Sequence, residues 1–181
     1  MPDTWKTLES ETLNDCNVFR VRREHSERSS DQKHADFYVI DSPNWVNVIA
    51  LDVQENVVMV EQFRHGIGET ILELPGGLID KNEMPLEAAR RELLEETGYT
   101  SEEWRLIGSS HPNPAIQSNT IFHFLALRCE LTGTTSFDPN ESLVPRLVAS
   151  RESSRLIQTG VVTHSLVVAA FAYYWGSLGN S

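Results

Sequence analysis

Three glutamates that stand close together in the chain are the residues best suited to chemistry. Glu95 and Glu96 follow Glu92 at distances of three and four residues, so in a helix their carboxylates would leave one face within a few ångströms of each other. Carboxylates at this density are the hard oxygen ligands that Mg²⁺ or Mn²⁺ prefers. Taken alone, however, the three glutamates also describe a solvated acidic helix face, and such faces are the commoner arrangement.

The helix that would carry these glutamates is predicted at residues 85–97. Pro85 suits the first turn of a helix, and Gly98 suits the left-handed residue that ends one. Apolar residues recur along this segment at helical spacing, so they would face a core. The predicted core stripe is Leu86, Ala89 and Leu93.

The residues around the helix make the signal much more specific. In order along the chain, the constrained positions are Gly77, Glu83, Arg91-Glu92-Leu93, Glu95-Glu96 and Gly98-Tyr99. This pattern resembles the Nudix box, which is Gly, five residues, Glu, seven residues, Arg-Glu-apolar, one residue, Glu-Glu, one residue, Gly-apolar. Every fixed position is matched. Tyr99 replaces the aliphatic residue that is usual in the family, a change that concerns packing and leaves the chemistry intact.

The resemblance implies a role for each part of the box. It implies that the Mg²⁺ ligands, with Mn²⁺ as a possible substitute, are Glu92, Glu95, Glu96 and the carbonyl of Gly76. It also implies that Arg91 and Glu83 brace the helix and orient those carboxylates, a supporting role that metal sites usually need. The bound ions would neutralise a diphosphate, activate a water and stabilise the leaving phosphate.

Outside the box, the chain resembles the ADP-ribose pyrophosphatase branch of the family, which also acts on other nucleoside diphosphate sugars. The features that carry this resemblance are EQFRHG at residues 61–66, ELPGG at 73–77, Pro114 and a pair of strands before the catalytic domain. The branch implies that Arg64 contacts the substrate's phosphates, since a guanidinium can bind two phosphate oxygens at once. A surface arginine without a role is the alternative.

Two further parts of the site are assigned through the same resemblance. The catalytic base is expected in the loop around Glu141, with Asp138 as the second candidate; otherwise Glu95 or Glu96 would act on the water. Trp5, Phe37 and Trp45 are candidates for stacking the nucleobase, although core packing is the commoner role of such aromatics. The branch also implies a homodimer in which the N-terminal strands are exchanged.

The expected reaction is Mg²⁺-dependent hydrolysis of the diphosphate bond of ADP-ribose or another nucleoside diphosphate sugar. It would give a nucleoside monophosphate and a sugar phosphate. Two alternatives stay open: a nucleoside triphosphate pyrophosphohydrolase of the oxidised-nucleotide type, and a sensor that binds a nucleotide sugar without cutting it. The sensor is disfavoured because it has no need of a metal-activated water.

The expected fold is an α/β class Nudix-type α/β/α sandwich with a mixed sheet and a small N-terminal antiparallel β hairpin. Residues 1–43 are predicted to form N-terminal strands that serve dimerisation, and residues 44–181 the catalytic domain. Alternating and apolar runs predict the strands and further helices. The strands are expected within 17–40 (a hairpin) and at 45–51, 56–63, 69–74, 104–108, 120–131 and 143–149, and the helices at 151–159 and 162–175, the latter capped by Thr163.

Composition narrows the partners. The formal net charge of the chain is -11, which disfavours binding to a phosphate backbone, so neither nucleic acid nor an anionic membrane is an expected partner. Cys16 and Cys129 have no neighbours at ligand spacing, and two reduced thiols are expected. The polar N-terminus shows no secretion signal, so the cytoplasm is the expected compartment.

Overall fold

The structure is a computed structural model that describes residues 2–137 and 142–179. The chain forms two compact units, each described here by itself. The N-terminal unit comprises Met1–Asn44 and His111–Thr120, and the core unit comprises Trp45–Ser110 and Ile121–Ser181.

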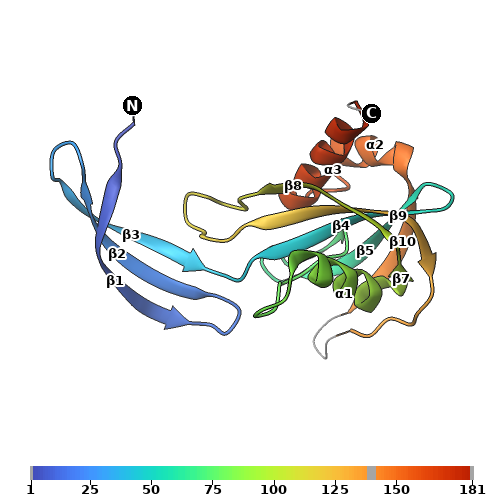
Figure 1. Ribbon diagram of the computed structural model, residues 1–181, viewed down its shortest axis with the longest axis horizontal. Helices are drawn as coiled ribbons and strands as arrows, with labels where there is room; N and C mark the ends of the chain where they lie inside the picture. Colours follow the sequence, from blue (N-terminus) through green and yellow to red (C-terminus); the bar gives the residue numbers. More distant parts are fainter. Residues whose placement is uncertain (1, 138–141, 180–181) are drawn as a thin grey trace. The chain divides into compact units, whose positions relative to one another are not determined.

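The N-terminal unit is built on a three-stranded antiparallel sheet in the order β1-β2-β3 (Figure 1). Its strands are β1 (Trp5–Asp15), β2 (Arg20–Arg28) and β3 (His34–Asp41). The predicted hairpin corresponds to β2 and β3, whereas β1 was not expected. Every residue of β1 is exposed, so the strand is held by its pairing with β2 and shows no hydrophobic alternation that sequence could reveal.

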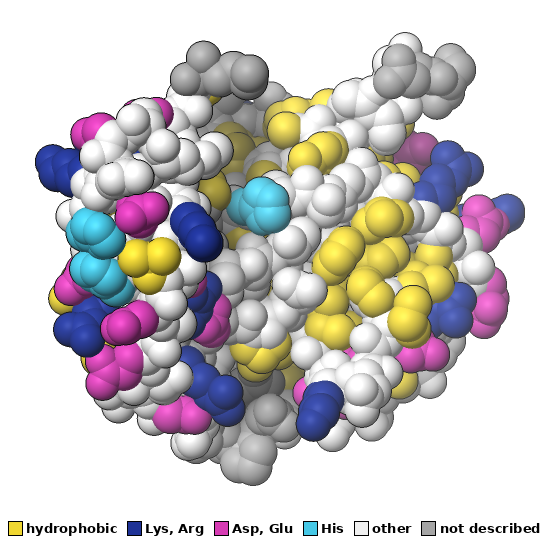
Figure 2. Space-filling model, turned by 60° about the vertical axis from the view of Figure 1, so that its left-hand side comes forward, with side chains coloured by type: hydrophobic (Ala, Val, Ile, Leu, Met, Phe, Trp, Pro, Cys, Tyr) yellow, Lys and Arg dark blue, Asp and Glu magenta, His cyan; other side chains and the backbone are white. Residues whose placement is uncertain are grey.

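Charged side chains on this sheet pair across neighbouring strands. Arg23 on β2 contacts Glu11 on β1 at 2.9 Å, and His25 contacts Asp36 on β3 at 2.7 Å. Figure 2 shows Lys and Arg side chains interspersed with Asp and Glu on one face of the molecule. Exposed pairs of this kind contribute little to stability.

The segment His111–Thr120 completes the N-terminal unit by joining the end of β3. The Ile40 N–H donates to the carbonyl of Ile116 at 2.7 Å, and the Ser118 hydroxyl donates to Asp41 at 2.7 Å. This polar loop is therefore tied to the strand by both backbone and side-chain hydrogen bonds.

The core unit contains a seven-stranded mixed sheet with the order β10-β5-β4-β9-β7. Strand β6 pairs with β5, β8 pairs with β9, and the β4–β9 pair is parallel. The strands are β4 (Trp45–Asp52), β5 (Asn56–Arg64), β6 (Glu69–Glu73), β7 (Tyr99–Thr100), β8 (Glu103–Ser110), β9 (Ile121–Leu131) and β10 (Leu143–Ala149). Six of them were predicted, and β7 is a two-residue strand that no periodicity could indicate.

Helices cover both faces of this sheet. Helix α1 (Pro85–Thr97) packs on the face that carries Val46 and Val48 of β4, and α3 (Ser165–Leu178) packs on the face that carries Ile49. Figure 1 shows the strands lying between the two helices. A strand buried on both faces reads as a continuous apolar run, as β4 does. The predicted α/β/α sandwich with a mixed sheet is confirmed.

The C-terminal helices differ in detail from expectation. A 3₁₀ turn (Ser150–Glu152) leads into the short helix α2 (Ser153–Gln158). Helix α3 starts two residues after Thr163, with His164 at the N-cap and no side-chain capping bond, so the predicted Thr163 cap is wrong. No helix in the described part of the chain is both long and apolar enough to span a bilayer.

Candidate active site

Helix α1 has the predicted bounds and presents the acidic residues at one place. At its start, the Met84 N–H donates to the Glu87 carboxylate at 3.2 Å. At its end, Gly98 has φ 75° and its N–H donates to the Leu94 carbonyl at 2.8 Å. A Cβ on Gly98 would lie 2.7 Å from the Gly133 carbonyl oxygen, so glycine is required for both conformation and space.

Arg91 organises the carboxylates of the box. Its Nε and Nη2 donate to the two oxygens of Glu83, both at 2.9 Å. Its Nη1 donates to Glu92 at 2.8 Å and to Glu95 at 3.2 Å. The bonds from Arg91 hold the pKa of Glu83 below its usual value, and the bonds to Glu83 and Glu92 raise the pKa of Arg91. One guanidinium thus donates hydrogen bonds to three neighbouring carboxylates.

Glu96 lies on the buried side of the same helix face. It is 4% exposed, and its Oε2 accepts the Gly76 N–H at 2.9 Å. A Cβ on Gly76 would overlap the Val46 carbonyl oxygen, and one on Gly77 would lie 2.7 Å from the Glu92 carboxyl carbon. The two glycines therefore let the backbone approach both the sheet and the acidic face closely.

The donor set fits a hard divalent cation in its chemistry, because three carboxylates and the Gly76 backbone meet at this helix face. In their present positions, the residues in 2–137 and 142–179 include no group of three or more His, Cys, Asp or Glu side chains arranged to hold an ion. Glu92 and Glu95 are directed to Arg91, and Glu96 to the Gly76 N–H. Each of these hydrogen bonds uses one oxygen of its carboxylate: Oε1 of Glu92, Oε2 of Glu95 and Oε2 of Glu96.

Arg64 lies at the end of β5 and is engaged in a second polar cluster. Its Nε and Nη2 donate to the two oxygens of Glu73 at 2.6 and 2.9 Å, and His164 Nδ1 lies 2.9 Å from Glu73 Oε2. Burial alone would raise the pKa of Glu73, but the hydrogen bonds from Arg64 and the nearby His164 ring lower it to about 2. Glu73 thus fixes the direction of the Arg64 guanidinium, while 43% of the Arg64 side chain stays exposed.

The three aromatic candidates divide between the units. Trp5 and Phe37 lie together on the N-terminal sheet, with ring centroids 4.9 Å apart in an edge-to-face arrangement, and the Arg28 guanidinium lies 5.6 Å from the Trp5 ring. Trp45 begins β4 in the core unit, and its buried indole N–H has no hydrogen-bond partner among the described residues. The structure therefore brings Trp5 and Phe37 together.

The predicted base, Glu141, and its alternative, Asp138, fall outside the described residues. The described chain on either side of them is well anchored. The Ser136 N–H donates to the Glu95 carbonyl at 2.9 Å, and Leu143 pairs with Gln62 on β5. At Ser136 the described chain therefore contacts the acidic helix.

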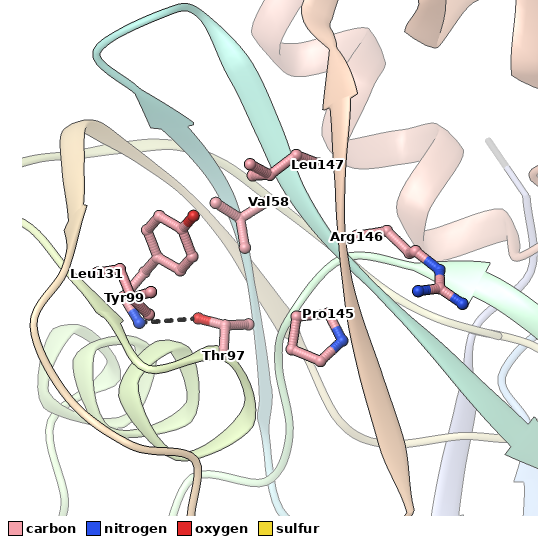
Figure 3. A pocket seen from close by; sticks show the side chains of 7 residues that line it. All are labelled: Val58, Thr97, Tyr99, Leu131, Pro145, Arg146 and Leu147. Atoms are coloured by element: carbon pink, nitrogen blue, oxygen red, sulfur yellow. Dashed lines mark hydrogen bonds between the residues drawn. The ribbon is translucent and has the colours of Figure 1, made fainter.

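A shallow pocket lies beyond the C-terminal end of α1 (Figure 3). The Tyr99 N–H donates to the Thr97 hydroxyl at its rim. It has one charged lining residue, Arg146, which is paired with Glu61 at 2.7 Å. The side chains that line it are Val58, Thr97, Tyr99, Leu131, Pro145, Arg146 and Leu147. No carboxylate of the box lines this pocket, so it lies apart from the predicted chemistry.

Sequence reasoning missed two residues of the polar cluster at Arg64. Glu73 could have been noticed, because it is a carboxylate at the end of an apolar strand and three residues before Gly76. His164 gives no local signal, since it meets Glu73 only when α3 packs on the sheet.

Comparison with known proteins shows which family has this arrangement. A model of the NUDIX domain matches residues 42–158. The chain belongs to the Nudix hydrolase family. Members of this family generally depend on divalent cations.

Similar proteins agree with the assignment to this family. The chain is similar to an ADP-ribose pyrophosphatase of Bacillus subtilis (strain 168), with 29% identity over 75% of this chain and 74% of that protein. It is also similar to an ADP-ribose pyrophosphatase of Mycobacterium tuberculosis (strain ATCC 25618 / H37Rv), with 28% identity over 91% and 80%. A crystal structure of an ADP compounds hydrolase shares the fold, with a TM-score of 0.85 at 20% identity over 97% of this chain and 95% of that one.

Proposed function

We propose that this Nudix hydrolase cleaves the diphosphate bond of ADP-ribose or another nucleoside diphosphate sugar, with Mg²⁺ or Mn²⁺ as cofactor. The products are a nucleoside monophosphate and a sugar phosphate. The observation that carries the proposal is the acidic face of α1, where Arg91 gathers Glu83, Glu92 and Glu95 while Glu96 holds the Gly76 backbone.

The proposed metal ligands are Glu92, Glu95, Glu96 and the carbonyl of Gly76. When bound, the divalent ion supplies charge neutralisation of the diphosphate and lowers the pKa of a water. Arg91 keeps its two bonds to Glu83 if Glu92 and Glu95 turn away from it, so the helix face stays braced. Glu96 is nearly buried and fixes the Gly76 loop.

The phosphate subsite is proposed at Arg64. Two hydrogen bonds to Glu73 hold its guanidinium, so the side chain loses little further conformational freedom when it binds an anion. Its side chain is partly exposed and therefore accessible to substrate. This subsite stands on β5, whose neighbour β6 leads directly into the ELPGG segment and the Gly76 loop. The residue that binds the phosphates and the loop that contributes to the metal site would therefore be carried by adjacent strands.

The nucleobase is proposed to stack on aromatic side chains. Trp5 and Phe37 already form one cluster, and Trp45 is the candidate from the core unit. As in the ADP-ribose pyrophosphatase branch, residues 1–43 would contribute to a homodimer and residues 44–181 would carry catalysis. The exposed pair of Trp5 and Phe37 supports this use, because burial of aromatic surface is favourable.

Product analysis tests the substrate class. The protein is incubated with Mg²⁺ and ADP-ribose, GDP-mannose, UDP-glucose, NADH or 8-oxo-dGTP, and the products are identified by mass. AMP and ribose 5-phosphate from ADP-ribose are the expected result. Release of pyrophosphate from 8-oxo-dGTP alone would favour the triphosphate reading, and binding without Mg²⁺-dependent turnover would favour a sensor. Repeating the reaction in heavy-oxygen water shows which phosphate receives the solvent oxygen.

The base is tested separately. We propose Glu141 as the group that takes a proton from the attacking water, so Glu141→Gln should lower turnover strongly, by roughly 10²- to 10⁴-fold, while leaving KM almost unchanged. If turnover stays near normal, the base lies elsewhere, and Glu95→Gln is the next variant to measure.

A further inference from the structure

Two buried polar side chains lie side by side on the central strands of the core sheet. Asn47 of β4 and His123 of β9 are register partners on neighbouring parallel strands. Asn47 is 5% exposed and His123 is fully buried. The adjacent residues on β4, Val46 and Val48, are apolar, so this pair stands out from an otherwise hydrophobic strand.

The hydrogen bonds of the pair form one continuous chain. Asn47 Nδ2 donates to the carbonyl of Leu166 in the first turn of α3 at 3.1 Å, so its Oδ1 is the acceptor that faces His123 Nδ1 at 2.7 Å. His123 Nδ1 therefore carries the proton, and Nε2 accepts from the Ser110 hydroxyl at 3.0 Å. Burial lowers the pKa of His123 to about 4, which keeps the ring neutral, as this chain requires.

Tyr173 packs beside His123, near the Ser110 end of this hydrogen-bond chain. Its ring lies 5.3 Å from the His123 ring, and its hydroxyl donates to the Ser109 carbonyl at 2.7 Å. A Cβ on Gly108 would overlap the Tyr173 ring, so glycine is needed for the ring to lie against β8. The pair is thus fixed from β4, β8, β9 and α3 together.

Stability alone does not account for such a pair. Buried polar groups at best recover the hydrogen bonds that they lose to water, whereas apolar side chains of similar size would stabilise the same position through burial. Fully satisfied polar networks instead rigidify a core and specify one arrangement. A rigid Asn47 would fix the backbone that lies against it.

That neighbour is the Gly76 backbone. The N–H groups of Val46 and Val48, on either side of Asn47, donate to the carbonyls of Gly77 and Pro75 at 3.0 and 2.9 Å. Asn47 therefore lies directly opposite Gly76, and a Cβ on Gly76 would be 2.7 Å from the Asn47 Cα. Any shift of β4 at Asn47 would move the loop that the box begins with.

The same pairing determines which way the Gly76 carbonyl faces. The carbonyls before and after it point to β4, and in extended backbone successive carbonyls alternate in direction. The N–H and the carbonyl of one residue share a side, and the Gly76 N–H is bonded to Glu96. The Gly76 carbonyl is therefore directed away from β4, toward the side of the acidic helix.

We propose that Asn47, locked by His123 and the Leu166 carbonyl, is a positioning residue that holds the Gly76 carbonyl in place for a divalent cation. This rests on the proposed function, because it takes Gly76 as a metal ligand. Neither Asn47 nor His123 touches the cation in this proposal. They act through the backbone that lies against β4.

The test measures Mn²⁺ binding to the full-length protein without substrate, by calorimetry and electron paramagnetic resonance. The main variant is the double substitution Asn47→Leu and His123→Leu, which replaces the polar pair by apolar side chains. We expect a melting temperature close to that of the wild type and Mn²⁺ affinity weakened about tenfold or more, as found when groups that support metal ligands are removed. Unchanged affinity in a folded variant would overturn the proposal.

Two further variants keep the test decisive. Ser110→Ala retains both buried residues and removes only the hydroxyl at the end of the chain, so it should fold and weaken Mn²⁺ binding about threefold. If the double variant does not fold, unchanged affinity in Ser110→Ala overturns the proposal. Asn56→Ala is the matched control: it breaks a side-chain bond to Asp52 at the other end of β4, and should lower stability without changing Mn²⁺ affinity.

Failure of the metal site itself gives a different result. Glu96→Gln should abolish most Mn²⁺ binding if the carboxylates of α1 are ligands. If Glu96→Gln binds Mn²⁺ as the wild type does, the proposed metal site is wrong. If Glu96→Gln loses binding while the double variant and Ser110→Ala retain it, only the positioning role is wrong.

Discussion

The N-terminal sheet and the acidic face of α1 both contain many ion pairs, but the two regions use them differently. On the N-terminal sheet the pair of Arg23 and Glu11 is accessible, because these side chains are 43% and 61% exposed. At the acidic face Arg91 is 29% exposed and its partner Glu92 is 14% exposed. Charges that are shielded from water interact more strongly, because the effective dielectric constant is lower.

The exposure of an ion pair thus determines how much its loss would cost. On the exposed sheet, an ion pair can be lost at little cost and mainly keeps the surface polar. At the acidic face, Glu83 and Glu92 are 16% and 14% exposed and share Arg91 as partner, so removal of Arg91 leaves charges that are poorly solvated. Variants that remove one charge at a time from each region therefore test whether exposure separates the two regions.

The largest difference is expected in catalysis. Glu96→Gln keeps an acceptor for the Gly76 N–H but removes a proposed metal ligand, so turnover should fall by roughly 10²- to 10³-fold. Glu11→Gln on the exposed sheet is the control and should leave turnover unchanged. Rates with Mg²⁺ and ADP-ribose, measured after circular dichroism has shown both variants to be folded, decide the matter. Near-normal turnover of Glu96→Gln would remove this residue from the site.

The next effect concerns the stability of the core unit at acid pH. The folded-state pKa of His123 is lowered to about 4 from 6.5, so on acidification the unfolded chain takes up this proton first. The associated stability is fully present above about pH 6.5 and is lost as the pH falls to about 4, by roughly 3 kcal/mol. Urea unfolding across this range should show a shallower pH dependence in His123→Gln than in the wild type. An equal dependence in both proteins would contradict the prediction.

A smaller effect is expected on stability at neutral pH. Arg91→Ala leaves Glu83 and Glu92 without their shared donor, and should lower the free energy of unfolding by about 2 kcal/mol. Arg23→Ala removes an equally well-formed but exposed pair and should change it by less than about 0.5 kcal/mol. Urea unfolding of the two variants side by side provides the measurement. Equal losses would show that exposure does not separate the two regions.

The smallest effect would give the N-terminal sheet a function of its own. If Trp5 stacks the nucleobase, Trp5→Ala should raise KM for ADP-ribose about tenfold with little change in kcat, in line with the energy of base stacking on an aromatic ring. Tyr38→Ala, at an exposed aromatic on β3, is the control. Unchanged KM would leave Trp5 as a packing residue of the sheet, and a monomer in light scattering would count against the proposed homodimer.

The sequence predicted the elements whose signal is local. Helix α1 was predicted with the correct bounds because Pro85 and Gly98 mark its ends. The strands β4, β5 and β9 were predicted because buried strands appear as apolar runs. Strand β1 was missed for the opposite reason, since its residues are all exposed and its stability comes from pairing with β2.

The candidate site divides along the same line. The clustering of Glu92, Glu95 and Glu96 was predicted from their spacing on one helix, which determines which side chains can meet. The bracing by Arg91 was predicted from the resemblance to the Nudix box. The shared use of Glu73 by Arg64 and His164 was not predicted, because these residues come from β5, β6 and the start of α3. The proposed metal ligands, the catalytic base and the residues that stack the nucleobase stay predictions.

By itself, then, the sequence determined the family and the chemistry type, since the Nudix box and α1 need only neighbours in the chain to be recognised. Only the tertiary structure decided that Asn47 lies opposite Gly76 and is locked by His123, 76 residues away. Contacts of this kind depend on which strands pair and in which register. That choice is made by the burial of the whole sheet between α1 and α3, and no short segment of the chain contains it.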